Sequence, residues 1–370
     1  MKKLIYFILV SMVFLSAYYS NEKWQGKIYK EQGVIIIENE GPGLLERTPS
    51  KQIEFEEVLS IGKEEGEDYF VFYDKLDVTV DSEGNIYILD IGNQRILKFN
   101  EKGEFIWQAG RKGQGPGEFQ SRPSHYTYSI RLTTSEDIAV RDEKLIHFFN
   151  KSGDYQKTLK IDRRIWDFDF IPDGRLLISL SLVNQIGNSA AFYSSDGEFM
   201  GEFPDEYIYD TIQASFGISC GARYIVRSDK VYVSLLGPYE IREYNLEGEL
   251  LRKIRRDLEL ESPFVKIKDQ GRAWQTSNVS GPCFISPNGM IVNFVTLVEE
   301  KGEKKRKIRG REITTSILEF NKFLDFFNNK GQFLGSYVLK ERGLRFIDSK
   351  GFFYFSESNP YPCIIRAKLK

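Results

Sequence analysis

Two kinds of tight turn alternate along most of the chain, and their order constrains the fold more than any other feature. The first kind joins two apolar segments, and its six copies lie at residues 80–84, 133–137, 171–174, 227–230, 286–289 and 347–351. The second kind follows an aromatic residue, and its five copies lie at residues 99–103, 149–153, 193–197, 244–248 and 327–331. Most copies contain a glycine, which reaches a positive φ at little cost. The pattern therefore predicts a series of β-hairpins.

Apolar residues alternate on both sides of these turns, which is typical of short antiparallel strands. Two hairpins in series make a four-stranded unit, but six turns of the first kind against five of the second leave the last unit one strand short. Residues 53–70 resemble the fourth strand and exit loop at 105–119, so they supply the missing strand. We predict an all-β fold over residues 53–370, a six-bladed β-propeller of four-stranded antiparallel blades, closed by an N-terminal strand that pairs with the last blade.

The N-terminus has the pattern of an export signal. Lys2 and Lys3 precede an apolar run at residues 4–15, and small residues follow it. The run is too short to cross a bilayer comfortably, which favours a cleaved signal peptide over residues 1–20. Tyr18 stands where a lipoprotein would carry its lipidated cysteine, which argues against a lipid anchor. We expect an extracytoplasmic protein, periplasmic or secreted, and an uncleaved N-terminal segment remains the alternative.

Two segments depart from the repeat. Residues 21–52 are predicted to be an irregular lead-in in which Val34–Ile37 adds an edge strand. Residues 299–316 are a charged insertion in blade 5 that breaks the strand pattern, and its basic run, 304–311, is expected to be a solvated loop or a contact for a partner or an anionic glycan. The net charge of −2 gives no general case for nucleic acid.

Residues 78–103 resemble an NHL repeat, through the pattern Asp90-Ile-Gly-Asn93-Gln-Arg95 and the turns on either side of it. Together with the glycine-rich segment 110–119, they are similar to bacterial exported six-bladed propeller proteins, most of which have no known activity. The resemblance implies architecture and export more than chemistry. It also implies that Asp90, Asn93 and Arg95 tie blade loops together.

Histidine and cysteine usage limits the chemistry. The chain has two histidines, His125 and His147, which are too few for a catalytic zinc site. His147 lies in a strand pattern and is expected to be packed. The three cysteines lie far apart, and we expect small apolar core residues, with one disulfide as the alternative. No supported Ser-His-Asp arrangement was found.

Trp166-Asp167-Phe168-Asp169-Phe170 alternates, so both carboxylates are expected on one face of a strand next to the channel. Sugar-lactone hydrolases on six-bladed propellers hold a divalent cation with such oxygen ligands. A calcium-dependent, lactonase-like hydrolase is therefore the alternative function, and calcium the one cofactor to consider.

The leading hypothesis is a binding or scaffolding module without catalytic residues. Its partner would be a protein, a small molecule or a glycan at the face built from the loops between and within blades. No nucleic acid is expected, and a membrane only through an uncleaved N-terminal segment. The predicted ligand-binding residues are Arg122, His125, Asp167, Arg223, Arg272 and Trp274.

Overall fold

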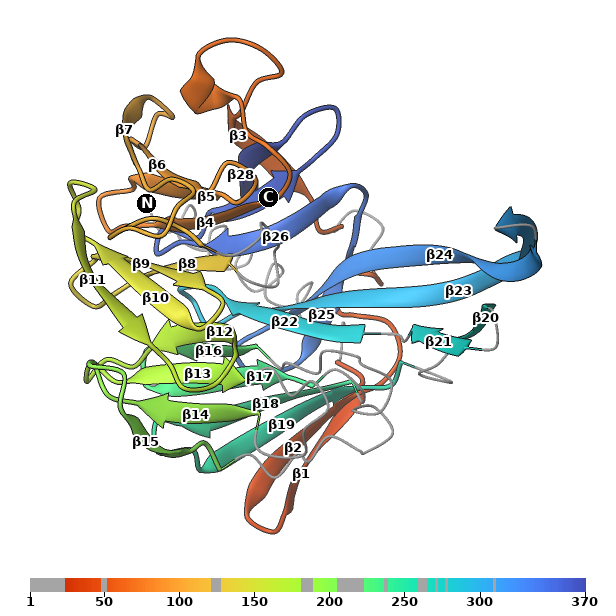
Figure 1. Cartoon of the computed structure of the whole chain (residues 1–370). Coiled ribbons are helices and arrows are strands. Elements are labelled where there is room, and N and C mark those ends of the chain that lie inside the picture. Colours follow the sequence, from red (N-terminus) through yellow and green to blue (C-terminus); the bar gives the residue numbers. More distant parts are fainter. Residues whose placement is uncertain are drawn as a thin grey trace, which may run out of the picture.

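The structure of the protein is a computed structural model. It describes residues 24–47, 52–120, 128–180, 189–204, 223–235, 239–258, 265–269, 272–276, 279–308 and 311–370. Six antiparallel sheets are arranged in a ring, as Figure 1 shows. The predicted signal peptide at residues 1–20 lies outside the described residues.

Each blade has four strands, in agreement with the turn pattern. Blade 1 contains β4 (Leu76–Val80), β5 (Ile86–Asp90), β6 (Arg95–Phe99) and β7 (Phe105–Ala109). Blade 2 contains β8 (Tyr128–Leu132), β9 (Ile138–Asp142), β10 (Leu145–Phe149) and β11 (Tyr155–Lys160). Blade 3 contains β12 (Ile165–Phe170), β13 (Leu176–Leu180), β14 (Ala190–Tyr193) and β15 (Phe199–Glu202).

Blade 4 contains β16 (Tyr224–Arg227), β17 (Lys230–Ser234), β18 (Glu240–Asn245) and β19 (Leu250–Arg256). Blade 5 contains β22 (Val279–Ile285), β23 (Ile291–Ile308), β24 (Arg311–Phe327) and β25 (Phe333–Leu339). Blade 6 contains β26 (Arg342–Ile347), β27 (Phe353–Glu357), β28 (Cys363–Leu369) and the N-terminal strand β3 (Phe55–Ile61). Within the described residues, the helical content is one short 3-10 turn, η1 (Asp68–Phe70), and no helix is long and apolar enough to cross a membrane.

The N-terminal strand closes the ring. Strand β3 pairs antiparallel with β28, from Ile61 opposite Ile364 to Phe55 opposite Leu369. The innermost strands β4, β8, β12, β16, β22 and β26 then contact one another in order around the ring, and β26 contacts β4 again. The innermost strands therefore surround a central channel without an open seam.

The second kind of turn is stabilised by one side chain. The Oδ1 atom of Asn100 accepts hydrogen bonds from the backbone N–H groups of Lys102 and Glu104, and Gly103 has a φ of 81°. Asn150, Asn245 and Asn328 repeat the arrangement in blades 2, 4 and 5. An asparagine that caps its own turn explains why the sequence repeats an aromatic residue followed by Asn.

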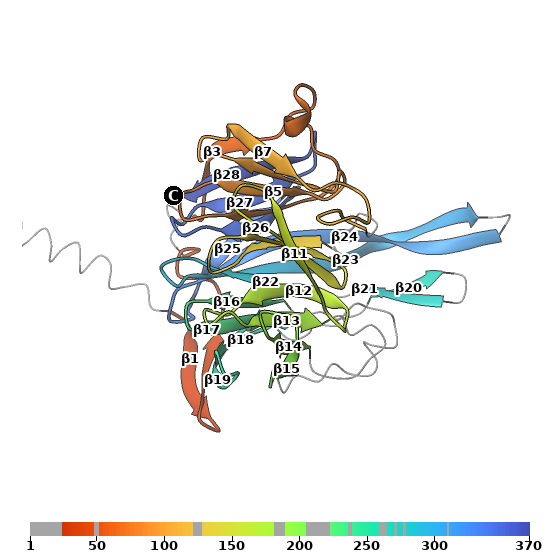
Figure 2. The same cartoon turned by 60° about the vertical axis from the view of Figure 1, so that its left-hand side comes forward.

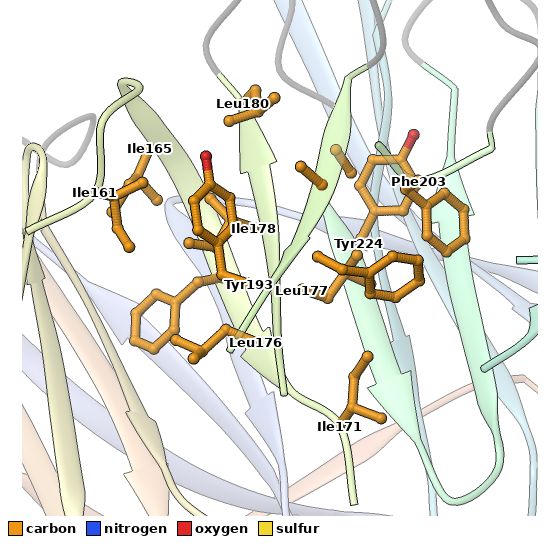
Figure 3. Close-up of a cluster of buried hydrophobic side chains, with 14 of the residues drawn as sticks. Ile161, Ile165, Ile171, Leu176, Leu177, Ile178, Leu180, Tyr193, Phe203 and Tyr224 are labelled. Carbon is orange, nitrogen blue, oxygen red and sulfur yellow. The ribbon is translucent and has the colours of Figure 1, made fainter. Parts of the chain in front are cut away.

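The hydrophobic core lies between neighbouring blades, where the faces of two sheets pack together. Figure 3 shows one such cluster, in which Leu177 of β13 is buried close to Tyr224 of β16. The Phe203 ring packs edge-on against Tyr224, with the ring centroids 5.3 Å apart. This packing fixes each innermost strand at its place beside the channel.

The residues of the NHL-like pattern tie loops together, as the resemblance implied. Asp90 accepts hydrogen bonds from the Tyr73 backbone and from Asn93. The Arg95 guanidinium forms an ion pair with Asp90 and donates to the carbonyl oxygens of Asp68 and Val71. These contacts hold the loop that enters blade 1.

His147 and two of the cysteines are packed, as predicted. His147 is 2% exposed, and its Nδ1 atom lies 2.8 Å from the Thr158 hydroxyl. Cys283 and Cys363 are buried and carry free thiols. Cys220 lies outside the described residues.

The lead-in is not irregular, which corrects the sequence prediction. It contains a hairpin of β1 (Gly26–Glu31) and β2 (Val34–Asn39), and β2 pairs parallel with β19. The hairpin extends blade 4 to six strands. Val34–Ile37 forms an added strand, as expected, and the buried Ile36 and Ile37 attach it to the blade.

The charged insertion is also more regular than its composition indicated. Residues 299–308 and 311–316 do not break the strand pattern, because β23 and β24 stay paired up to Ile308 opposite Arg311, with one bulge between Glu300 and Gly302. In Figures 1 and 2 this hairpin projects far outside the ring. A smaller hairpin of β20 (Val265–Asp269) and β21 (Arg272–Thr276) lies beside it.

Candidate functional site

A cavity of about 190 Å³ lies in the central channel, and all six innermost strands contribute to its wall. The wall residues are Thr79, Val80, Arg131, Leu132, Asp169, Arg223, Ile225, Val226, Arg227, Phe284, Ile285, Arg345, Phe346 and Ile347. Four of these side chains are arginines, and one is a carboxylate. The wall is otherwise mainly aliphatic and aromatic. The cavity therefore combines an apolar surface with an excess of positive charge.

Asp167 organises one side of the wall. Its Oδ2 atom lies 2.7 Å from Nη2 of Arg131 and 2.5 Å from Nε of Arg223, and its Oδ1 atom accepts from the Phe168 backbone. Burial opposes ionisation of Asp167, but the charges of Arg131, Arg223 and Arg141 outweigh it and lower its pKa to about 2. Asp167 is 6% exposed and does not itself line the cavity. It holds two wall arginines in place from behind.

The two other carboxylates of the channel connect neighbouring blades. The Asp169 side chain accepts one hydrogen bond from its own strand, at the Phe170 N–H, and one from the next blade, at the Val226 N–H. Burial raises the pKa of Asp169. Asp77 in β4 accepts from the Ile130 N–H in blade 2 and lies 3.5 Å from Arg131. Both carboxylates are thus used to join blades.

Arg345 and Arg227 are wall arginines that form no ion pair among the described residues. The Arg345 side chain donates from Nε to the hydroxyl of Ser356, 2.8 Å away, and forms no ion pair with a carboxylate among the described residues. Burial lowers the pKa of Arg345, the nearby Asp77 opposes this effect, and Arg223 adds to it. The Arg227 side chain forms neither an ion pair nor a hydrogen bond within the part of the chain that the structure describes. Two arginines of the wall therefore have no carboxylate partner among the described residues.

The formal charges around the channel do not balance. The arginines are Arg131, Arg141, Arg223, Arg227 and Arg345, and the carboxylates are Asp77, Asp167 and Asp169. Among the described residues, these five cations against three anions leave a formal charge of +2. A buried positive charge needs an anion or water nearby to offset its lost hydration. The arrangement can bind an anion, and a guanidinium presents paired donors that match a carboxylate or phosphate.

Sequence reasoning located only part of this site. Arg223 lies in the cavity wall and Asp167 lies directly behind it, in contact with each other. Arg272 and Trp274 lie in β21, whose hairpin lies beside the long blade 5 hairpin outside the ring. Arg122 and His125 lie outside the described residues. A role in binding remains a prediction for all six.

Arg131, Arg227 and Arg345 were missed. Arg131 and Arg227 lie near the ends of innermost strands, and this position was the available signal. Arg345 is different, because β26 pairs Leu344 with Phe355 and Phe346 with Tyr354, which leaves Arg345 as the extra residue of a β-bulge. A bulge redirects one side chain and frequently occurs near functional sites. The alternation rule applied to the sequence places the wrong side chain toward the channel here.

The carboxylates do not fit a calcium site. Calcium requires six to eight oxygen ligands, most of them free to coordinate. Asp167 shares one oxygen between two guanidinium groups, and both oxygens of Asp169 accept backbone hydrogen bonds. The described residues contain no group of three or more His, Cys, Asp or Glu side chains arranged to hold a metal. These donors are already engaged, so no step of a metal-dependent hydrolysis is assigned to them.

Comparisons with known proteins agree with this architecture. A family model described as "6-bladed beta-propeller" matches residues 74–177. No curated protein matches the chain. Among solved structures, a protein from Bacteroides fragilis described as exported shares 12% identity with a TM-score of 0.56, over 90% of this chain and 99% of that one.

A second solved structure, from Bacteroides vulgatus and assigned to a family of unknown function, also shares 12% identity with a TM-score of 0.56. The match covers 86% of this chain and 98% of that one. Identity at this level establishes the fold and says nothing of the ligand. The chain is a six-bladed β-propeller that is similar in fold to these two Bacteroides proteins, one of them described as exported.

Proposed function

We propose that the protein is an exported binding module whose central channel binds a small organic anion through its arginines. The observation that carries this proposal is the pair Arg227 and Arg345, two guanidinium groups in the cavity wall without a carboxylate partner among the described residues. Positive charge that the fold does not neutralise costs stability, and functional sites are where such costs are retained. A carboxylate or phosphate group would complete the local charge balance.

The cavity limits the size and nature of this ligand. Its volume of about 190 Å³ lies below the range of roughly 300–1,000 Å³ typical of sites for larger ligands. The side chains of Ile225, Phe284 and Phe346 give part of the wall an apolar surface. The Arg223 guanidinium lies 5.6 Å from the centroid of the Phe284 ring. A ligand with one or two acidic groups and a short apolar body fits this wall best.

The extracytoplasmic location rests on the N-terminal sequence. Lys2 and Lys3 with the apolar run at 4–15 have the pattern of a signal peptide. A protein described as exported is among the structures with the same fold. A periplasmic or secreted protein of this kind would meet its ligand outside the cytoplasm. Mass spectrometry of the N-terminus after expression in a bacterial host would test cleavage near Ala17.

The binding proposal can be tested by calorimetry with a panel of small anions. Succinate, citrate, benzoate and inorganic phosphate would be titrated into the purified protein, each beside an uncharged analogue, such as succinamide for succinate. We expect at least one anion to bind and its uncharged analogue not to bind. Arg345→Met should weaken the binding by about tenfold, because one charge-assisted contact is lost.

Arg164→Met is the matched control. Arg164 pairs only with Glu143 at the surface, with its side chain 50% exposed, and does not line the cavity. Equal affinity for the charged and uncharged ligands, or equal loss in the two arginine variants, would refute the proposal. Turnover of a lactone by the purified protein would instead favour the hydrolase alternative.

A further inference from the structure

The hairpin of blade 5 extends far beyond the sheet to which it belongs. Strand β22 pairs with β23 only up to Thr296, and β25 pairs with β24 only from Lys322 onward. Residues 297–308 and 311–321 therefore form a two-stranded ribbon, which we call the arm. At about 3.3 Å per residue, twelve residues of β23 extend roughly 40 Å. Figures 1 and 2 show the arm projecting from the ring in both views.

The outer part of the arm, residues 301–312, has a strongly basic sequence. Residues 301–312 contain Lys301, Lys304, Lys305, Arg306, Lys307, Arg309 and Arg311, against Glu303 and Glu312. Seven cations and two anions give a formal charge of +5, whereas the whole chain has a net charge of −2. The charge of this short segment is thus opposite in sign to that of the protein.

The cross-strand neighbours of the cations differ between the two ends of the arm. Near the ring, the Lys301 ammonium pairs with Glu319 3.0 Å away and also with Glu299. Further out, the cross-strand neighbours of Lys304, Lys305 and Arg306 are Thr315, Thr314 and Ile313. The pairing thus places neutral residues opposite three successive cations. Lys304 and Lys305 are exposed.

A two-stranded ribbon is only marginally stable in water by itself. The arm also exposes Phe320 and Ile317, at 51% and 46% of their surface. Clustered charge and exposed apolar side chains on a projecting element both oppose folding in isolation and favour contact with a partner. The charge indicates that this partner is anionic.

We propose that the arm binds an acidic polysaccharide, a linear chain that carries carboxylate or sulfate groups. Successive residues of a strand point to opposite faces, so the exposed Lys304 and Lys305 place their charges on the two faces of the ribbon. A flat bilayer surface would contact one face only, whereas a flexible polymer can follow both. The ribbon is a linear array of charge, which matches a linear polyanion.

The test uses the purified full-length protein and heparin as the probe. The arm variant combines Lys304→Gln, Lys305→Gln, Arg306→Gln and Lys307→Gln. The control combines Lys102→Gln, Lys160→Gln, Lys330→Gln and Lys368→Gln, four exposed lysines elsewhere, with the same change in charge. Fluorescence anisotropy with a labelled heparin oligosaccharide would measure the affinity at low and at physiological ionic strength.

We expect the arm variant to lose roughly tenfold or more in affinity, because several exposed charge contacts are removed together, and the control to change by less than about twofold. Wild-type binding should weaken as salt rises. Equal loss in both variants, or no binding of heparin by the wild type, would overturn the proposal. Stronger binding to phosphatidylglycerol vesicles or to single-stranded RNA than to heparin would overturn it as well. Anion binding in the channel should be the same in both variants, so this test is independent of the channel.

Discussion

Two groups of arginines around the channel use the same side chain for different purposes. Beside blade 3, Arg131 and Arg223 converge on Asp167, and their charge is balanced within the fold. Arg345 in β26, across the ring from blade 3, has a serine hydroxyl as its partner. Arg227, at the other end of β16 from Arg223, has neither an ion pair nor a hydrogen bond with another described side chain. An arginine near a cavity therefore indicates binding only when the fold leaves its charge unbalanced.

This difference has an energetic consequence. A balanced buried pair is costly to break, because the remaining partner keeps a charge without hydration or a counterion. An unbalanced buried charge is already unfavourable, so its removal costs the folded state little. Substitutions in the Asp167 group should therefore lower stability, whereas substitutions of Arg227 and Arg345 should weaken ligand binding and leave stability nearly unchanged.

The largest effect is expected from Asp167→Asn. The substitution leaves Arg131 and Arg223 without their shared carboxylate and should lower the free energy of unfolding by about 3 kcal/mol. Urea denaturation followed by circular dichroism would measure it. Asp173→Asn, in an exposed turn, is the control and should change stability by less than about 0.5 kcal/mol. A loss of stability below about 1 kcal/mol for Asp167→Asn would show that the arginines around Asp167 do not depend on this carboxylate for their charge balance.

The pH dependence of stability should also report on the Asp167 carboxylate. The pKa of Asp167 in the folded protein is about 2, below the ordinary value of 3.8 for the unfolded chain. A depressed pKa contributes stability that is present above the unfolded value and lost as pH falls toward the folded value. We expect Asp167 to contribute about 2 kcal/mol at pH 6, and this contribution should decline between pH 4 and pH 2.

Denaturation of the wild type and of Asp167→Asn across this pH range would check the assignment. The difference in stability between the two proteins should narrow as the pH falls. Burial raises the pKa of Asp169, so this carboxyl should contribute to stability in the opposite direction. The difference in stability between the wild type and Asp169→Asn should therefore not narrow as the pH falls. A constant difference between wild type and Asp167→Asn would contradict the pairing.

How far the sequence predicts this molecule depends on the kind of signal. The turns of each blade and the closing strand β3 could be read because Gly and Asn positions and apolar alternation recur with a fixed order. The arm could not be predicted from the sequence, because both faces of a projecting ribbon are exposed. The alternation of apolar and polar residues that marks a half-buried strand is therefore absent. The β-branched Ile313, Thr314 and Thr315 were the remaining indication of a strand.

The channel was read incompletely for a related reason. Asp167 and Arg223 could be placed by strand pattern, but their pairing depends on the packing of blade 3 against blade 4, which no local pattern encodes. Arg345 reaches the cavity through a bulge, and one extra residue reverses the expected inside–outside assignment. Sites built from side chains of several blades need the ring before they can be recognised.

Arg345→Met should be tolerated by the fold, in contrast to Asp167→Asn. Burial lowers the pKa of Arg345, which means that the folded state disfavours its charge. Removing that charge should leave stability unchanged or raise it by up to about 1 kcal/mol. Thermal unfolding without added ligand would measure this. A loss of more than about 1 kcal/mol would mean that Arg345 is a structural residue like Arg131.

The smallest effect is expected at Arg227, and it sharpens the comparison most. Arg227 lies at the end of β16, lines the cavity and is partly exposed. In the proposed complex its charge would act on the ligand under stronger solvent screening than that of the more deeply buried Arg345. Arg227→Gln should weaken binding of the anion found by calorimetry by about threefold and leave the free energy of unfolding within about 0.5 kcal/mol of wild type. Arg223→Gln should weaken binding and also destabilise, because Asp167 loses a partner. If the two variants behaved alike in both measurements, the balance of charge around Asp167 would not be what separates a structural arginine from a binding one.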